Sequence, residues 1–127
     1  MEGKIKHTIH ESEVPAKKLP GRDHKMIISP TSLGSKRMCF GIAIFPPESH
    51  APSHIHPGEE EIIYILSGYG QIFFDGEPED VRQGTCVYIP EKTEHSIKND
   101  SKEPMKLAYV FSPPVVQGSY DRNPNTQ

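Results

Sequence analysis

Proline and glycine interrupt this chain of 127 residues too often to leave room for long helices, since thirteen prolines and ten glycines are scattered along it. Proline removes a backbone donor and disrupts a helix interior, and both residues favour turns. Between these breaks the apolar residues alternate with polar ones or form short runs, at residues 4–10, 38–45, 62–66, 71–74, 86–89 and 105–111. Such runs are typical of β-strands, so the chain is predicted to be all-β.

Turn signals separate these predicted strands at regular intervals. They are the dipeptides Pro46-Pro47, Ser67-Gly68, Asp75-Gly76 and Pro113-Pro114. Asp-Gly between two strand-like runs is a strong signal for a two-residue hairpin. Many short strands at even spacing indicate a sandwich or a closed barrel, and the two-sheet jelly roll is one such architecture. At this length we expect a single domain over residues 1–127.

The two ends of the chain are polar and punctuated by proline. We expect an N-terminal arm over residues 1–21, with an edge strand in the alternating residues 4–9. The core of the domain is predicted at about residues 37–112, and the tail over residues 117–127 is predicted to be disordered.

Composition excludes several classes of function. The formal net charge is −3 with dispersed basic residues, so we expect no nucleic-acid binding. No segment approaches the roughly 20 apolar residues of a membrane helix, and the N-terminus lacks the apolar core of a signal peptide. We therefore expect a cytoplasmic protein without membrane contact, in which Cys39 and Cys86 are small, reduced core side chains.

Two histidine-containing segments point to a metal site. On a strand, His54 and His56 lie on the same face, because side chains alternate between faces. Pro57-Gly58 predicts a turn, after which Glu61 returns in the next strand, and a second hairpin delivers His95 from a distant part of the chain. Three imidazoles and one carboxylate can hold a divalent transition metal and leave coordination positions for a substrate.

These segments resemble the two signature boxes of the cupin superfamily over about residues 37–112. The matching positions are His54, His56, Glu61 and Gly68 in the first box, and Gly84, Pro90, His95 and Asn99 in the second. The resemblance implies a double-stranded β-helix, that is, a jelly-roll barrel, with a homodimer as the expected assembly. Glu60 could replace Glu61 as the ligand, although the spacing to Gly68 favours Glu61. Two glycines usual in the family are replaced here, by Glu48 and Lys92.

The remaining histidines and turn residues have plainer interpretations. We expect His7, His10, His24 and His50 not to be ligands. Glu59 is predicted to lie in a solvated loop, and Gly68 and Asn99 are predicted to be turn residues rather than catalytic ones.

A site of this kind allows three functions. The first is an enzyme that isomerises, decarboxylates or oxygenates a small oxygenated metabolite such as a sugar, keto acid or dicarboxylate. The second is a non-catalytic protein that binds or senses such a ligand, and the third is a purely structural metal. The charge of Glu61 favours manganese, iron, nickel or cobalt, with zinc also compatible.

Proton transfer would need a further acid or base near the metal. The candidates are Tyr88, His50, Glu48, Gln71 and Tyr64, although Tyr64 falls on the strand face opposite Glu61 and is better explained as a packed aromatic. Cupin lyases of dimethylsulfoniopropionate tend to place a tyrosine two residues after the metal glutamate. Ile63 stands there in this chain, which counts against that activity.

Overall fold

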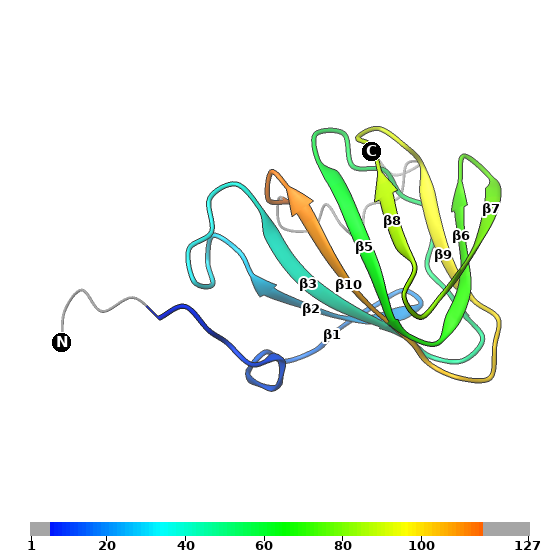
Figure 1. Ribbon diagram of the computed structural model, residues 1–127, viewed down its shortest axis with the longest axis horizontal. Helices are drawn as coiled ribbons and strands as arrows, with labels where there is room; N and C mark the ends of the chain where they lie inside the picture. Colours follow the sequence, from blue (N-terminus) through cyan, green and yellow to red (C-terminus); the bar gives the residue numbers. More distant parts are fainter. Residues whose placement is uncertain (1–5, 116–127) are drawn as a thin grey trace.

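A computed structural model describes residues 6–115, which form two antiparallel sheets (Figure 1). The six-stranded sheet has the order β1-β2-β3-β10-β5-β8, and the four-stranded sheet has the order β4-β9-β6-β7. The strands are β1 (Lys17–Leu19), β2 (Arg22–Ile28), β3 (Cys39–Phe45), β4 (Ser49–His50), β5 (Glu60–Ser67), β6 (Tyr69–Phe74), β7 (Glu77–Arg82), β8 (Cys86–Ile89), β9 (His95–Asn99) and β10 (Met105–Ser112). The predicted all-β jelly roll is confirmed.

The core lies between the two sheets and follows from alternation along each strand. In β5, Ile63 and Ile65 are fully buried, whereas Ile62 and Tyr64 point outward and are 54% and 45% exposed. The buried cluster draws on both sheets and includes Phe45, Ile72, Ile89, Met105 and Leu107. Each such side chain contributes about 1.5–3 kcal/mol when it leaves water. This inward set holds the two sheets together around the space where the site lies.

Two of the predicted turns take the expected form. Asp75 and Gly76 join β6 to β7, and both have positive φ angles, of 49° and 87°. Two positive φ angles are what a type I′ hairpin turn requires, so this hairpin is confirmed. Gly68, between β5 and β6, has a φ of 84°, and a Cβ built there would lie 2.5 Å from the Pro104 carbonyl oxygen. Gly68 is therefore the turn residue that was predicted.

Lys92 and Glu48, which replace two glycines usual in the family, keep a glycine-like backbone. Their φ angles are 66° and 56°, in the left-handed region that side chains normally avoid. The left-handed conformation costs roughly 1–2 kcal/mol for a residue with a Cβ. Each of the two residues therefore adopts a backbone conformation that glycine adopts more easily, at a local energetic cost.

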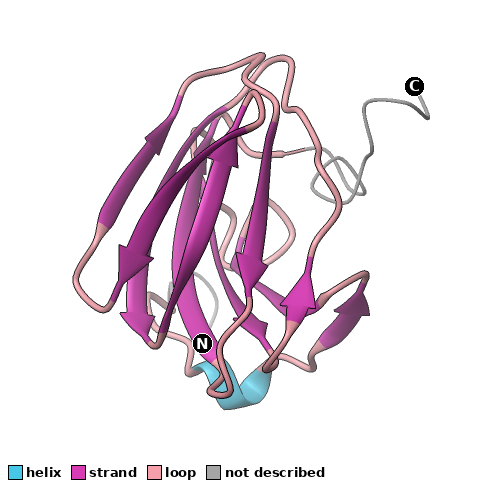
Figure 2. Cartoon of the chain, turned by 90° about the vertical axis from the view of Figure 1, so that its right-hand side faces the viewer, coloured by secondary structure: helices cyan, strands magenta, loops and turns pink. Residues whose placement is uncertain are grey.

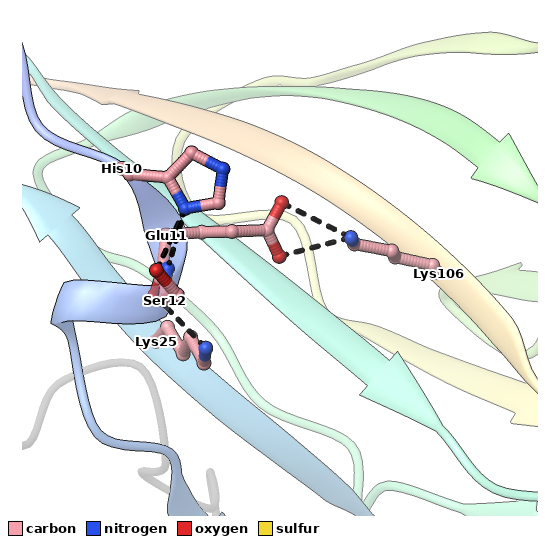
Figure 3. Close-up of polar contacts among 5 residues, drawn as sticks. All are labelled: His10, Glu11, Ser12, Lys25 and Lys106. Carbon is pink, nitrogen blue, oxygen red and sulfur yellow. Dashed lines mark hydrogen bonds and ion pairs between the residues drawn. The ribbon is translucent and has the colours of Figure 1, made fainter.

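The N-terminal arm differs from its prediction. Residues 6–10 are not in a strand and lead into a short 3-10 helix, η1 (Glu11–Glu13), while residues 4 and 5 of the predicted edge strand lie outside the described residues. Figure 2 shows this helix at one end of the strands. Glu11 anchors it: its carboxylate accepts from Lys106 Nζ at 2.9 Å, and its carbonyl accepts from Lys25 Nζ at 2.9 Å (Figure 3). Side-chain contacts to β10 and β2, rather than a strand ladder, hold this part of the arm.

The sheet also begins earlier than expected, because β1 and β2 occupy residues 17–28. Their residues Lys17, Lys18, Asp23 and Lys25 are too polar to signal a strand in the sequence.

Of the two cysteines, Cys39 is buried as predicted, but Cys86 is exposed. Cys86 lies opposite Tyr64 in the pairing of β8 with β5, on the outward face, so its assignment to the core was wrong. The predicted disordered tail, residues 117–127, lies outside the described residues. Within residues 6–115 no helix is long and apolar enough to cross a membrane. The homodimer, the cytoplasmic location and the absence of nucleic-acid binding stay predictions.

Candidate metal centre

His54, His56 and His95 meet between the two sheets. One ring nitrogen from each of them lies within 4.8 Å of the others, and all three residues are buried. The backbone brings the two distant segments together, because His54 N–H donates to the His95 carbonyl and His95 N–H donates to the His54 carbonyl, both at 2.9 Å. The i, i+2 spacing of His54 and His56 then places both rings on the same side, as strand geometry predicts.

Backbone carbonyls orient two of these rings. Nδ1 of His54 lies 3.2 Å from the Pro52 carbonyl oxygen, and Nδ1 of His95 lies 3.0 Å from the Thr93 carbonyl oxygen. A carbonyl can only accept, so each Nδ1 carries the hydrogen and each Nε2 presents its lone pair. This is the arrangement by which proteins fix a histidine as a metal ligand.

Glu61 is the carboxylate that joins the cluster. It is 6% exposed, and its Oε1 lies 3.4 Å from Nε2 of His95. Glu60, one residue earlier, points to the outer face, where its carboxylate accepts from the Tyr88 hydroxyl. The geometry therefore favours Glu61 over Glu60.

Glu59 is not the solvated loop residue that was predicted. Its side chain is 12% exposed, and its Oε1 lies 3.8 Å from Nδ1 of His56. The bend at Pro57-Gly58 comes just before Glu59 in the chain. At this distance the Glu59 carboxylate is a negative charge close to the His56 ring.

The electrostatic surroundings shift the pKa values of two of these imidazoles in opposite directions. Burial, reinforced by His95 and His56, lowers the pKa of His54 to about 2, so this ring is neutral near pH 7. Burial also acts to lower the pKa of His95, but the hydrogen bond and negative charge of Glu61 outweigh it, so that pKa is raised.

These residues fit a divalent metal. Three buried imidazoles whose donor nitrogens converge, with a buried carboxylate oxygen 3.4 Å from one of them, match the ligand types of manganese, iron, nickel, cobalt and zinc sites. Protein metal sites of this composition do not distinguish these metals by ligand type alone. The cluster is thus a candidate centre for one ion of this group.

A cavity of about 40 Å³ adjoins the cluster. His54, Glu61 and His95 form part of its wall. The rest is mainly apolar and comes from Ala43, Phe45, Ile97, Leu107 and Phe111. The volume corresponds to about three water molecules at roughly 10–15 Å³ each, so the space suits a small ligand.

Three polar residues of this wall were missed as site residues, namely Arg22, His24 and Tyr109. Arg22 and His24 face inward at the start of β2, and these polar residues concealed the inward face of the strand in the sequence. The i, i+2 spacing of Arg22 and His24 would have indicated that both face the cavity only if residues 22–28 had first been recognised as a strand. The group of three converging histidines does not include His24.

His24 and Tyr109 form a hydrogen-bonded pair between the His24 Nε2 and the Tyr109 hydroxyl. Burial, then the charges of Arg22 and Lys17, lowers the pKa of His24 to about 4, so the ring is neutral near pH 7. A neutral imidazole and a phenol can exchange a proton with each other or with a bound ligand. The pair therefore places two groups that can exchange protons in the wall of the same cavity.

None of the five residues predicted as acid or base candidates lines this cavity. Tyr64 and Tyr88 are 45% and 57% exposed on the outer face of the six-stranded sheet, which also makes the packed-aromatic interpretation of Tyr64 wrong. Glu48 and His50 are exposed at β4, and His50 borders a shallow groove on the outer side of the four-stranded sheet. Gln71 of β6 donates to Asp80 of β7 at 3.2 Å. Strand parity turns these side chains away from the core.

Asn99 also has a different role from the predicted turn residue. It ends β9, is fully buried, and donates to the carbonyls of Phe45, Pro46 and Glu103 while accepting from Ser101. These bonds tie the loop after β3 to the loop before β10. Asn99 thus fixes the end of β9, the strand that begins with His95.

Comparison with known proteins agrees with this geometry. The cupin domain model matches residues 41–111. An uncharacterised protein of Methanocaldococcus jannaschii is 35% identical over 88 residues, covering 69% of this chain and 70% of that protein. The dimethylsulfoniopropionate lyase DddW of Ruegeria pomeroyi is 33% identical over 89 residues, covering 69% of this chain and 57% of the lyase. A predicted oxalate decarboxylase of Thermotoga maritima shares the fold, with a TM-score of 0.75 at 23% identity over 84% of this chain and 99% of that one. The chain belongs to the cupin family.

Proposed function

We propose that this protein is a divalent-metal-dependent enzyme that acts on a small oxygenated metabolite. One observation carries the proposal: the candidate ligands His54, Glu61 and His95 share one small, largely apolar cavity with the proton-exchanging pair His24 and Tyr109. A purely structural metal would need neither the cavity nor a proton-transfer pair beside it.

Each residue has a defined task in this proposal. His54, His56, Glu61 and His95 would hold the ion, and the bound ion would supply a Lewis acid that polarises an oxygen of the ligand. Tyr109 gives a proton to the ligand or takes one from it, and His24 exchanges that proton with the Tyr109 hydroxyl.

The apolar part of the cavity completes the arrangement. Phe45, Leu107 and Phe111 are each at most 2% exposed and exclude bulk water from the space beside the pair. In a dry environment hydrogen bonds and charges act more strongly than in water.

The relatives support an enzyme in general without selecting a reaction. One is named a lyase and one a predicted decarboxylase, and both reactions act on small acids. Fold similarity does not transfer an activity, so isomerisation, decarboxylation and oxygenation all stay open. The volume of about 40 Å³ favours the small acids over sugars.

The proposal is tested by turnover after reconstitution with Mn²⁺, Fe²⁺, Ni²⁺, Co²⁺ or Zn²⁺ in turn, followed by NMR on a panel of small keto acids, dicarboxylates and sugars. With the substrate found, Tyr109→Phe is expected to keep its metal and lose turnover by about 10²–10⁴-fold, the usual contribution of a positioned acid or base. Tyr88→Phe, on the outer face, is the matched control and is expected to retain activity. Equal losses in the two variants would contradict the role of Tyr109.

The second candidate is a protein that binds or senses the same class of ligand without converting it. The same cavity supports this alternative, because a small space beside a bound metal can hold a ligand whether or not the ligand reacts. Calorimetry separates the two: a sensor takes up about one equivalent of ligand and returns it unchanged, whereas an enzyme releases product.

A further inference from the structure

Gly41 is a glycine in the middle of β3 that the local backbone does not require. It is buried and stands at an inward position, between the inward residues Cys39 and Ala43. Unlike Gly68 and Gly76, it has no positive φ, so a residue with a side chain could adopt its backbone conformation. A glycine inside a strand weakens the strand, and it often marks a place where another group approaches closely. The space beside Gly41 therefore identifies what the glycine is for.

The ring of Tyr109 occupies this space. Gly41 lies directly opposite Tyr109 in the pairing of β3 with β10. A Cβ built at Gly41 would overlap with the hydroxyl oxygen and with Cζ of Tyr109, and it would lie 2.7 Å from the Lys25 carbonyl oxygen. Even the methyl group of an alanine would therefore have to displace the phenol ring.

The strand order explains why the ring has to pass over Gly41. His24 belongs to β2 and Tyr109 to β10, and β3 lies between these two strands. Neighbouring strands are about 4.8 Å apart, so the backbones of β2 and β10 are separated by about 10 Å. The Tyr109 hydroxyl reaches Nε2 of His24 because its ring crosses β3 at the position that carries no side chain.

Two ring contacts keep Tyr109 from turning aside. The His24 ring is nearly parallel to the phenol, with the ring centroids 5.4 Å apart and an angle of 11° between the planes. The Phe111 ring meets the phenol at 64°, with the centroids 5.2 Å apart. Because protein interiors are close-packed, a phenol pushed away from β3 can move only into the cavity that it lines. Such a movement would separate the hydroxyl from His24.

We infer that Gly41 is a positioning residue for the pair of His24 and Tyr109, because the absence of its side chain lets the phenol cross β3 and places the hydroxyl at His24 Nε2. Gly41 acts through Tyr109 rather than on the ligand itself. This inference rests on the proposed function, in which the pair moves a proton of the ligand, and it names the residue on which the geometry of the pair depends.

NMR of the protein without added metal or ligand tests the inference. The readouts are the nitrogen resonance of His24 Nε2 and the carbon resonance of Tyr109 Cζ, assigned with the help of Tyr109→Phe. In Gly41→Ala we expect the His24 resonance to move to the value that it has in Tyr109→Phe, because both variants lose the hydrogen bond. Wild-type resonances of both residues in Gly41→Ala would overturn the inference. So would the same His24 resonance in the wild type and in Tyr109→Phe, since the hydrogen bond would then be absent.

Gly70→Ala is the matched control. Gly70 is a buried glycine of β6 in the other sheet, and a Cβ built there would lie 2.5 Å from the Lys98 carbonyl oxygen. The control therefore adds the same methyl group at a similarly tight strand position away from the pair. We expect Gly70→Ala to keep both resonances at their wild-type values. Equal shifts in Gly41→Ala and Gly70→Ala would report a general loosening of the core and would overturn the inference.

A double variant covers the case in which Gly41→Ala does not fold. Gly41→Ala, Tyr109→Ala removes the ring that the new methyl group would displace. We expect the methyl group to lower the midpoint of urea unfolding less in the Tyr109→Ala background than in the wild type. If Gly41→Ala alone does not fold, the double variant is expected to fold. A methyl group that destabilises both backgrounds equally, or a double variant that does not fold although Tyr109→Ala does, would overturn the inference.

Turnover separates this inference from the proposed function. With a substrate found, Gly41→Ala is expected to lose turnover by about 10²–10⁴-fold, as Tyr109→Phe is, while Gly70→Ala retains activity. Wild-type turnover in Gly41→Ala would overturn the positioning role alone. Absence of turnover by the wild type with each of the five candidate metals would overturn the proposed function, whereas the NMR measurement would still decide whether Gly41 places the Tyr109 hydroxyl at His24.

Discussion

Exchanging a single carboxylate for an amide tests which glutamate belongs to the metal site. Glu61→Gln removes a charge that is 6% exposed and lies 3.4 Å from His95 Nε2, whereas Glu60→Gln removes an exposed one on the opposite face of β5. The two residues are neighbours with the same chemistry. Any difference between the variants therefore reports the face on which each side chain lies.

The expected magnitude follows from burial. Glu61 is buried, so water screens its interaction with a bound ion only weakly, although the desolvation of the carboxylate offsets part of that interaction. Interactions with charged groups retain about 1.5–3 kcal/mol, which corresponds to about 10- to 150-fold in metal affinity. We expect this loss for Glu61→Gln and a change below about threefold for Glu60→Gln, since exposed charges contribute little.

The assay is competition for Zn²⁺ or Mn²⁺ with a chelator of known affinity, with thermal unfolding as a check on the fold. The reasoning would be refuted if Glu60→Gln weakened binding more than Glu61→Gln. That result would transfer the ligand role to Glu60 and require β5 to shift by one residue.

Three further predictions concern pH, packing and assembly. The pKa of His95 is raised above the ordinary 6.5, so at a pH below that raised pKa the metal must displace a proton from His95. We therefore expect the metal affinity to fall with decreasing pH below the raised pKa and to be constant at higher pH. A metal affinity that does not depend on pH in chelator competition would contradict this prediction. Asn99→Ala removes buried hydrogen bonds to the Phe45 and Glu103 carbonyls, so we expect it to lower the free energy of unfolding, measured by urea denaturation, by about 2–4 kcal/mol. The control variant Asp100→Ala changes an exposed neighbour and is expected to leave this free energy almost unchanged. The expected homodimer is tested by light scattering: we predict that Ile62→Lys, at an outward position that is 54% exposed, shifts the protein toward monomer, and a monomeric wild type would refute it.

Strands that contain a short apolar run could be predicted from the sequence, and those without one could not. β5, β8 and β10 were anticipated because each contains such a run next to turn residues, and the β6–β7 hairpin followed from Asp75-Gly76. β2 was missed because two of its inward positions carry Arg22 and His24. A polar inward face looks like a loop in sequence and becomes recognisable only when neighbouring strands surround it.

The candidate site shows the same division. The metal cluster could be predicted because its members stand at fixed short spacings in two segments, and strand parity then determines their face. The residues around the cavity could not, since Arg22, His24 and Tyr109 come from β2 and β10, which are far apart in the chain and meet the site only through the sheet order. The acid–base candidates chosen by proximity in sequence, such as Tyr88 and His50, proved to face outward.

Elemental analysis of purified protein tests most directly whether His54, His56 and His95 hold an ion. The wild type and His50→Ala, which alters an exposed histidine, are predicted to carry about one equivalent of a divalent transition metal per chain. The double variant His56→Ala, His95→Ala is predicted to carry essentially none while keeping the strand content of the wild type in circular dichroism. Full metal occupancy in that double variant would contradict the account.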